Sequence, residues 1–192
     1  MNIIRWGSRL DKIALPATWG ATNLGKMIRM KKLIGTLVLL VLFNLAAQAQ
    51  TEETNIKEVI EHLFRGMQLG DSSMVRSVFH KEVTMATVYR NRENAIVLRR
   101  ESSIEDFVKS VGTPRADALN EEIWNLTVQR DGDFAQAWCD YAFYIGKKFS
   151  HCGVDAFHLF KTEKGWKIFH LADTRRSTNC TIPPAISNKY KN

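Results

Sequence analysis

The sequence predicts a mixed α+β fold, with helices placed ahead of a series of antiparallel strands. Apolar residues between positions 56 and 111 recur at the i, i+3, i+4 and i+7 spacing of helix faces. From residue 122 onward, β-rich runs alternate with short glycine-containing turns. The chain has 192 residues, of which 45% are hydrophobic and 24% charged, and this excludes collagen-like, low-complexity and mostly disordered proteins.

The N-terminal region has the pattern of a secretory signal peptide at residues 30–49. Met30-Lys31-Lys32 precedes an apolar run of about fifteen residues, and Ala47-Gln48-Ala49 supplies a small-x-small cleavage site. The apolar run is shorter than the roughly 20 residues that span a bilayer. We therefore expect cleavage after Ala49, export to the periplasm or the cell exterior, and no stable membrane insertion afterwards. An uncleaved N-terminal anchor is the alternative.

Residues 1–29 precede a signal that is complete without them, so we interpret them as an upstream extension. Translation could start at Met1, Met27 or Met30. Residues 50–176 then form one domain, and residues 177–192 are an irregular tail without periodicity.

The net positive charge of the chain comes almost entirely from residues 1–49, which we call the leader. Residues 1–49 hold seven basic residues and one acid, which leaves 20 basic and 19 acidic residues in 50–192. A nucleic-acid-binding surface needs clustered, uncompensated Lys and Arg. We therefore expect no nucleic-acid partner, although the whole chain carries a net charge of +7.

Three cysteines allow one intramolecular disulfide at most. Export to an oxidising compartment makes such a bridge possible. We expect Cys152 to pair with Cys180, because Cys139 lies in the middle of a strand on an apolar face. Three unpaired cysteines are the alternative.

Three helices and one strand are predicted before residue 115. Apolar residues from Ile56 to Met67 form the first helix face, Gly70 ends it, and Asp71 caps a short second helix. A strand spans 83–89. Ser102 and Glu105 then have capping-box spacing for a third helix, which Gly112 and Pro114 close.

Four strands follow as two hairpins. Strands at 123–130 and 133–145 flank Asp131-Gly132, a strong two-residue turn signal. Strands at 149–161 and 166–175 flank a three-residue turn, Glu163-Lys164-Gly165.

This order of elements resembles the nuclear transport factor 2-like superfamily, whose members include SnoaL-like polyketide cyclases, ketosteroid isomerase and scytalone dehydratase. The resemblance covers about residues 54–176 and rests on Gly70-Asp71-Ser72, Val78-Phe79-His80, Phe157–Lys161 and Gly165–Ile168. It implies a curved sheet wrapped around helices, making a cone with an apolar pocket, often paired as a dimer through the outer sheet face. It implies no particular activity, because this fold carries enzymes and non-enzymes.

Strand pairing counted from the turns predicts which side chains face the pocket. It places one imidazole pair, His158 and His170, directly opposed on the more apolar face, with Tyr141 one strand away. We expect this face to be concave, because burying apolar groups stabilises the fold and burying unpaired carboxylates destabilises it. The candidate ligand-binding residues are Trp124, Tyr141, His158, Trp166 and His170.

His158 and His170 are also candidate catalytic residues. A neutral imidazole could hydrogen-bond a ligand or act as a general base near neutral pH. The alternative is a pair of core histidines. No third ligand is predicted on that face, so we expect no metal site, and no motif predicts a cofactor.

The opposite face carries Asp140, Asp155 and Asp173, which pairing places in a row as a solvated, salt-bridged surface. The resemblance offers the reverse arrangement: Asp155-Ala156-Phe157 is similar to the Asp-x-Phe stretch of ketosteroid isomerase, whose Asp lies in the pocket and donates to the substrate oxygen. The faces would then swap, and Asp155 would be the key acid. We find no match for that enzyme's tyrosine or base, so steroid isomerisation is not carried over.

Apolar side chains on the aspartate face predict a homodimer. Exposed aromatic groups on a sheet commonly mark a partner surface. The predicted set is Trp138, Phe157, Leu159, Phe169 and Leu171.

The leading functional hypothesis is an exported protein that binds a small apolar or aromatic molecule, without established catalysis. An alternative is a cyclase, isomerase or dehydratase that uses His158 and His170, or Asp155, as general acid or base. A second alternative is a structural dimerisation module. The sequence has no Gly-rich phosphate loop, Cys-x-x-Cys, serine elbow or His-Glu-x-x-His, which argues against nucleotide, redox, serine-hydrolase and zinc-protease chemistry.

Overall fold

The computed structural model describes residues 18–101 and 103–191. The chain forms two compact units, Met1–Gln48 and Ala49–Asn192. Helix α1 (Thr18–Leu69) runs through the boundary between them.

The first unit contains the predicted signal peptide. Within α1, the stretch from Arg29 is long and apolar enough to cross a membrane by length and composition, a test that a signal sequence near the N-terminus also meets. The predicted cleavage after Ala49 and the export stay predictions. Of the predicted extension 1–29, residues 1–17 lie outside the described part of the chain.

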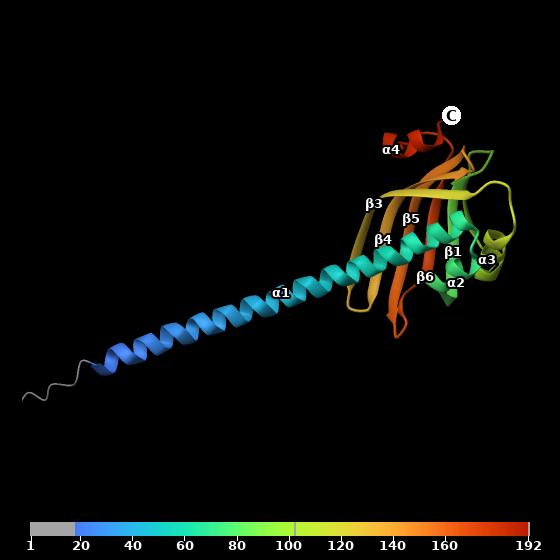
Figure 1. Cartoon of the computed structure of the whole chain (residues 1–192). Coiled ribbons are helices and arrows are strands. Elements are labelled where there is room, and N and C mark those ends of the chain that lie inside the picture. Colours follow the sequence, from blue (N-terminus) through green and yellow to red (C-terminus); the bar gives the residue numbers. More distant parts are fainter. Residues whose placement is uncertain (1–17, 102, 192) are drawn as a thin grey trace, which may run out of the picture. The chain divides into compact units, whose positions relative to one another are not determined.

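The second unit is built on one six-stranded sheet (Figure 1). Its order is β2-β1-β6-β5-β4-β3, and neighbouring strands are antiparallel except for the parallel pair β1 and β6. The strands are β1 (Phe79–Arg90), β2 (Ile96–Arg100), β3 (Leu119–Asp131), β4 (Phe134–Ile145), β5 (Lys148–Thr162) and β6 (Gly165–Arg175).

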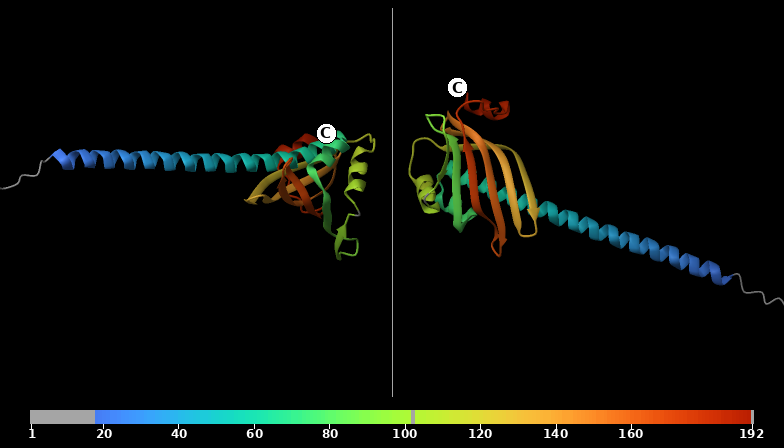
Figure 2. Two further views of the ribbon diagram at one scale, coloured as in Figure 1. Left: turned by 90° about the horizontal axis from the view of Figure 1, so that it is seen from below. Right: turned by 180° about the vertical axis from the view of Figure 1, so that it is seen from behind.

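Three helices cover one face of this curved sheet, as the views in Figure 2 show. They are the C-terminal part of α1, α2 (Ser72–Val78) and α3 (Ile104–Gly112). The apolar face predicted from Ile56 to Met67 packs on the sheet, where Ile60 and Phe157 are fully buried. We call the helix-covered side of the sheet the inner face and the opposite side the outer face. The α+β fold class predicted from the sequence is confirmed.

Helix boundaries follow local capping chemistry. Asp71 accepts a hydrogen bond from the Met74 N–H and caps α2, as the sequence predicts. Ser103 caps α3 by accepting from the Asp106 N–H at 3.1 Å. Ser102, the predicted cap, lies outside the described residues.

Two segments are more ordered than the sequence indicates. Residues 96–100, for which the sequence predicts no helix or strand, form β2 and pair with β1. The tail forms helix α4 (Pro184–Ser187) and the 3-10 helix η1 (Asn188–Tyr190), with α4 at one end of the sheet in Figure 1. Ile186 is buried, and the Tyr190 ring stacks on Tyr144 at 3.8 Å. The tail is therefore packed on the domain.

A disulfide joins Cys152 to Cys180, and Cys139 is a free, buried thiol. This confirms the predicted pairing. Cys152 also exchanges two backbone hydrogen bonds with Arg176, so the start of β5 is tied to the chain that leaves β6.

The predicted parity of β5 relative to β4 is wrong. The turns at Gly132-Asp133 and Gly146-Lys147 are each displaced by one residue from the expected position, which moves the pairing by two residues and keeps the parity. The bulge between Phe143 and Tyr144 shifts the β4–β5 pairing by one residue, so Tyr141 pairs with Gly153. A slip of one residue moves every side chain of a strand to the other face.

Candidate functional site

A cavity of about 330 Å³ lies between the inner face of the sheet and the helices α1 and α3. Its apolar wall comes from both layers, since helix residues meet residues of the strands β1, β4 and β6. The apolar residues include Leu63, Met67, Met85, Phe107, Phe143 and Leu171. This wall suits a ligand with an apolar or aromatic body.

The polar wall of the cavity comes from the strands β3 to β6. These strands supply three carboxyl groups, a phenol, an imidazole and a guanidinium: Glu121, Asp155, Asp173, Tyr141, His151 and Arg175. Thr87, Glu101, Asp106 and Ser110 also line the cavity, from β1 and from the segment around α3. Asp155 and Asp173 are paired neighbours on adjacent strands. Their surroundings differ.

Three donors surround the Asp173 carboxylate. Thr87 donates its hydroxyl to Oδ1 at 2.6 Å, and Arg175 donates Nε–H to Oδ2 at 2.7 Å. The Tyr141 hydroxyl lies 3.2 Å from Oδ2 and 2.9 Å from the Thr174 carbonyl oxygen, to which it can donate instead. Asp173 is therefore held as a fixed acceptor.

Close backbone approach makes the Tyr141 contact possible. A Cβ atom built on Gly153 would lie 1.7 Å from the Thr174 carbonyl oxygen and 2.8 Å from the Tyr141 ring. Only glycine fits there. Burial raises the pKa of Tyr141, so its phenol stays protonated and remains a donor.

Asp155 has no such set of donors. It is 3% exposed, it shares a hydrogen bond with the Glu121 carboxyl, and its Oδ2 has no partner among the described residues. Burial raises the pKa of Asp155 well above its usual 3.8, and the negative charges of Glu121 and Asp173 raise it further. Asp155 is therefore a neutral acid at neutral pH.

Glu121 completes an acid pair with Asp155. Burial raises its pKa to about 7, the charge of Asp173 adds to the rise, and Arg175 opposes it. Two adjacent carboxyl groups that cannot both ionise share a proton. The pair can therefore donate one hydrogen bond and accept another.

His151 lies beside Tyr141, with ring centroids 5.7 Å apart, and its Nδ1 is 2.9 Å from the Ser150 hydroxyl. Burial and the nearby charge of Arg175 lower the pKa of His151 to about 4. The ring is therefore neutral at neutral pH and adds polarity without charge.

The two predicted histidines lie on the outer face, away from the cavity. Their rings are 5.4 Å apart, and His170 Nδ1 lies 2.7 Å from the Thr84 hydroxyl. Burial and the neighbouring His158 lower the pKa of His170. The expectation that His158 and His170 point into the concave side is wrong, because the β4–β5 register is shifted.

The predicted tryptophans also lie elsewhere. Trp124 packs beside Ile186 on the tail, and Trp166 is buried in the core, where its Nε1–H donates to Glu52 at 2.8 Å. Of the five candidate ligand-binding residues, Tyr141 lines the cavity. Asp155 also lines it, as the alternative with swapped faces expects.

The set of apolar residues predicted for the outer face needs the same correction. Phe157 and Leu159 are fully buried in the core, and Leu171 lines the cavity. Trp138 and Phe169 remain outside, where Phe169 contacts His158. Asp140 also lies on this side, bonded to Asn125, and is therefore not in line with Asp155.

Sequence reasoning missed Glu121 and His151 as cavity residues. The alternation Leu119-x-Glu121-x-Ile123 could have shown that β3 begins earlier and turns Glu121 inward. No group of three or more His, Cys, Asp or Glu side chains is arranged to hold a metal ion in residues 18–101 and 103–191.

Most of the domain matches a known protein family. The model of the family described as "Putative lumazine-binding" matches residues 51–170. The chain belongs to this family. No curated protein matches the chain.

Solved structures of low sequence identity share the fold. A nuclear transport factor 2-like protein from Novosphingobium aromaticivorans is 16% identical, with a TM-score of 0.56 over 78% of this chain and 96% of that one. A nuclear transport factor 2-like protein of unknown function from Shewanella baltica is 19% identical, with a TM-score of 0.50 over 67% and 96%. A third, from Cytophaga hutchinsonii, is 11% identical, with a TM-score of 0.51 over 65% and 98%. The predicted superfamily is confirmed.

Proposed function

We propose that the domain binds a small, flat molecule with an apolar or aromatic body, and that Asp155 and Glu121 hydrogen-bond its polar edge. The observation that carries the proposal is Asp155, a buried acid in the cavity wall with an oxygen that no described residue satisfies. A ligand in the cavity can supply the missing partner.

Stability alone does not account for this acid. An unsatisfied buried polar group costs about 1–3 kcal/mol of folding free energy, and well-packed apolar replacements of buried charged groups are often neutral or stabilising. A strongly perturbed acid that lines a cavity is a candidate for a functional group. The position of Asp155 therefore supports a binding role.

The acid pair favours a ligand edge that carries both an acceptor and a donor. A protonated carboxyl donates O–H and accepts through its other oxygen, which matches a carbonyl next to a ring N–H. The family description, lumazine-binding, names a planar heterocycle of this kind. The cavity volume of about 330 Å³ lies at the lower end of the range for small-molecule pockets.

Lumazine is the first probe to test. Its fluorescence is titrated with the full-length wild-type chain, with Asp155→Leu, and with the matched outer-face control Asp140→Asn. We expect about a tenfold loss of affinity in Asp155→Leu, because one or more hydrogen bonds are lost, and no change in the control. Equal affinity in all three proteins would place any binding outside the cavity and contradict the proposal.

A general acid–base enzyme is the second candidate, and the pKa of about 7 at Glu121 favours it. A group with such a pKa can take up and return a proton at neutral pH. Exchange of solvent deuterium into 2-tetralone, an aromatic ketone with acidic C–H groups, measures this ability. Faster exchange with wild type than with Glu121→Gln would support an enzyme, and equal rates would leave binding alone.

We also propose that the domain works outside the cytoplasm. The leader pattern at residues 30–49 and the Cys152–Cys180 disulfide both support an oxidising destination. Cell fractionation with thiol alkylation tests this: a cytoplasmic chain with alkylatable Cys152 and Cys180 would contradict export.

The outer face supports a homodimer as a further part of the proposal. Phe134 and Trp138 are 44% and 52% exposed, and the Phe134 ring contacts His158 and Phe169. Sedimentation velocity compares wild type with Trp138→Glu. A dimer that becomes a monomer in the variant supports this surface, and a wild-type monomer contradicts it.

A further inference from the structure

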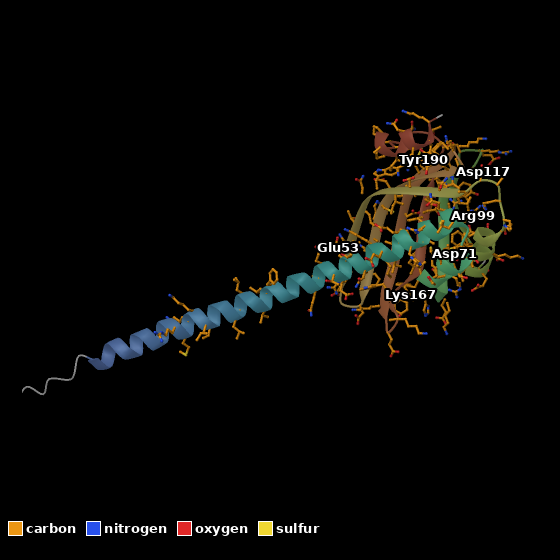
Figure 3. The ribbon with its side chains drawn as sticks, viewed as in Figure 1. Glu53, Asp71, Arg99, Asp117, Lys167 and Tyr190 are labelled. Carbon is orange, nitrogen blue, oxygen red and sulfur yellow. A yellow bond between two sulfur atoms is a disulfide. The ribbon has the colours of Figure 1, made fainter. Side chains whose placement is uncertain are left out.

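A second pocket, of about 480 Å³, opens beside the cavity and is dominated by arginine. Its wall includes Arg90 at the end of β1, Arg99 on β2, and Arg175 and Arg176 at the end of β6. Arg99 is labelled in Figure 3, toward the same end of the sheet as Asp117 and away from Lys167 at the opposite end. We call this the arginine pocket.

The four guanidinium groups are only partly neutralised. Arg175 pairs with Asp173 at 2.7 Å, and Arg99 pairs with Glu101 at 3.0 Å. Arg90 donates to the Asn94 carbonyl oxygen at 2.8 Å, which carries no net charge. Neither Arg90 nor Arg176 has an ion pair with an acid in the described part of the chain.

Two positive charges of this pocket are therefore left without an acidic partner among the described residues. The remaining polar groups of the wall are the His151 imidazole and the hydroxyls of Thr87, Tyr89, Ser150 and Ser177, of which the Thr87 hydroxyl already donates to Asp173. A phosphate monoester carries a charge of about −1.5 to −2 at pH 7, and its oxygens match the fork of arginine. Charge and donor type agree with such a group.

The arginine pocket shares part of its wall with the cavity. Thr87, His151 and Arg175 line both. The two pockets are therefore neighbours, and a molecule that occupies both would lie against these three residues. The acid pair and the arginines would select opposite parts of such a ligand, a neutral hydrogen-bonding edge and an anion.

We propose that the arginine pocket is a phosphate subsite, and that the ligand of the cavity carries a phosphate group on its aromatic or apolar body. The second half of this statement rests on the proposed function, whereas the first half does not. Arg90 and Arg176 bind the phosphate directly, and Arg175 links the two parts of the site through Asp173.

Binding of inorganic phosphate at constant ionic strength tests the subsite by itself. The variant Arg90→Gln/Arg176→Gln removes the two arginines that have no acid partner, and both are exposed, so the fold is expected to stay intact by circular dichroism. Arg65→Gln/Arg130→Gln removes two exposed arginines outside the arginine pocket and is the matched control. We expect the phosphate affinity to fall at least about tenfold in the first variant and to stay unchanged in the control. Equal phosphate affinity in all three proteins, or no phosphate binding to wild type, would overturn the subsite.

A matched set of aromatic probes separates the subsite from the cavity. Wild type is expected to bind 1-naphthyl phosphate at least about tenfold tighter than 1-naphthol, and this ratio is expected to fall toward one in Arg90→Gln/Arg176→Gln. If 1-naphthol binds and the phosphate adds no affinity, the phosphate inference is wrong while the proposed function stands. If inorganic phosphate binds through Arg90 and Arg176 but neither naphthyl compound gains affinity from its ring, the subsite stands and the proposed cavity function fails.

Discussion

Asp155 and Asp173 are the same residue type, are paired on neighbouring strands and line one cavity, yet their hydrogen-bond surroundings are opposite. Asp173 receives hydrogen bonds from Thr87 and Arg175 and lies beside the Tyr141 hydroxyl. Asp155 meets another acid and keeps one oxygen without a partner in the described structure. The environment, and not the residue type, decides whether a carboxyl group is a fixed hydrogen-bond acceptor or a neutral acid.

The two carboxyl groups therefore have different roles: Asp173 contributes to stability, and Asp155 is the group proposed to bind the ligand. The Asp173 network joins β1, β4 and β6 and so contributes to the fold. The Asp155–Glu121 pair carries an unfavourable desolvation, which the proposed ligand would offset. Substitutions on the two sides should therefore change the free energy of unfolding in opposite directions.

Asp173→Ala should have the largest effect. It leaves the buried Thr87 hydroxyl and the Arg175 guanidinium without their acceptor, and we expect a loss of about 3 kcal/mol in the free energy of unfolding. Urea denaturation measures it, with Asp140→Asn as the control. A loss below about 1 kcal/mol would show that the network does not stabilise the domain.

Asp155→Leu should stabilise the domain by about 1–2 kcal/mol at pH 8, because it removes a buried carboxyl that has a like-charged neighbour. The comparison fails if this variant is destabilised as strongly as Asp173→Ala. Circular dichroism during urea unfolding checks the native structure of both variants.

The acid pair should also give wild type a distinctive pH dependence. The folded pKa of Glu121, about 7, lies above its usual 4.5, so its contribution to stability is fully present below about pH 4.5 and is lost as the pH rises through 7. The slope is at most about 1.4 kcal/mol per pH unit for one proton. Glu121→Gln should flatten the slope between pH 4.5 and 7, and an unchanged slope would assign it to other groups.

Tyr141→Phe should have the smallest effect. It removes a hydroxyl that lies between the Thr174 carbonyl and Asp173 while the ring keeps its packing, so a loss of about 1 kcal/mol is expected. Thermal unfolding measures this difference. A loss as large as that of Asp173→Ala would mean that the phenol, and not the salt bridge, dominates the network.

Local sequence signals predicted the elements well. The helical periodicity from Ile56 to Met67, the cap at Asp71 and the turn near Gly132 each depend on interactions within a few residues. Residues 96–100 were missed because their pairing with β1 comes from a short, exposed edge strand with little hydrophobic alternation. The packing of the tail depends on Tyr144 and Ile186, which are far apart in sequence.

The site was harder to predict because it depends on register. The prediction placed Cys139 and Tyr141 correctly on the inner face, but it put the neighbouring strand β5 one residue out of step. The prediction therefore placed His158 in the pocket, where the structure has Asp155. Bulges such as that between Phe143 and Tyr144 absorb one residue and leave no mark in a hydrophobic pattern.

The Cys152–Cys180 disulfide also affects the arginine pocket. Cys180 is fastened to Cys152 a few residues beyond Arg176 and Ser177, which form one wall of the arginine pocket. With reduced thiols, that wall keeps the two backbone hydrogen bonds between Cys152 and Arg176 but loses its covalent link to β5. If the arginine pocket binds phosphate as we propose, a chain with free thiols should hold phosphate less firmly than the oxidised one.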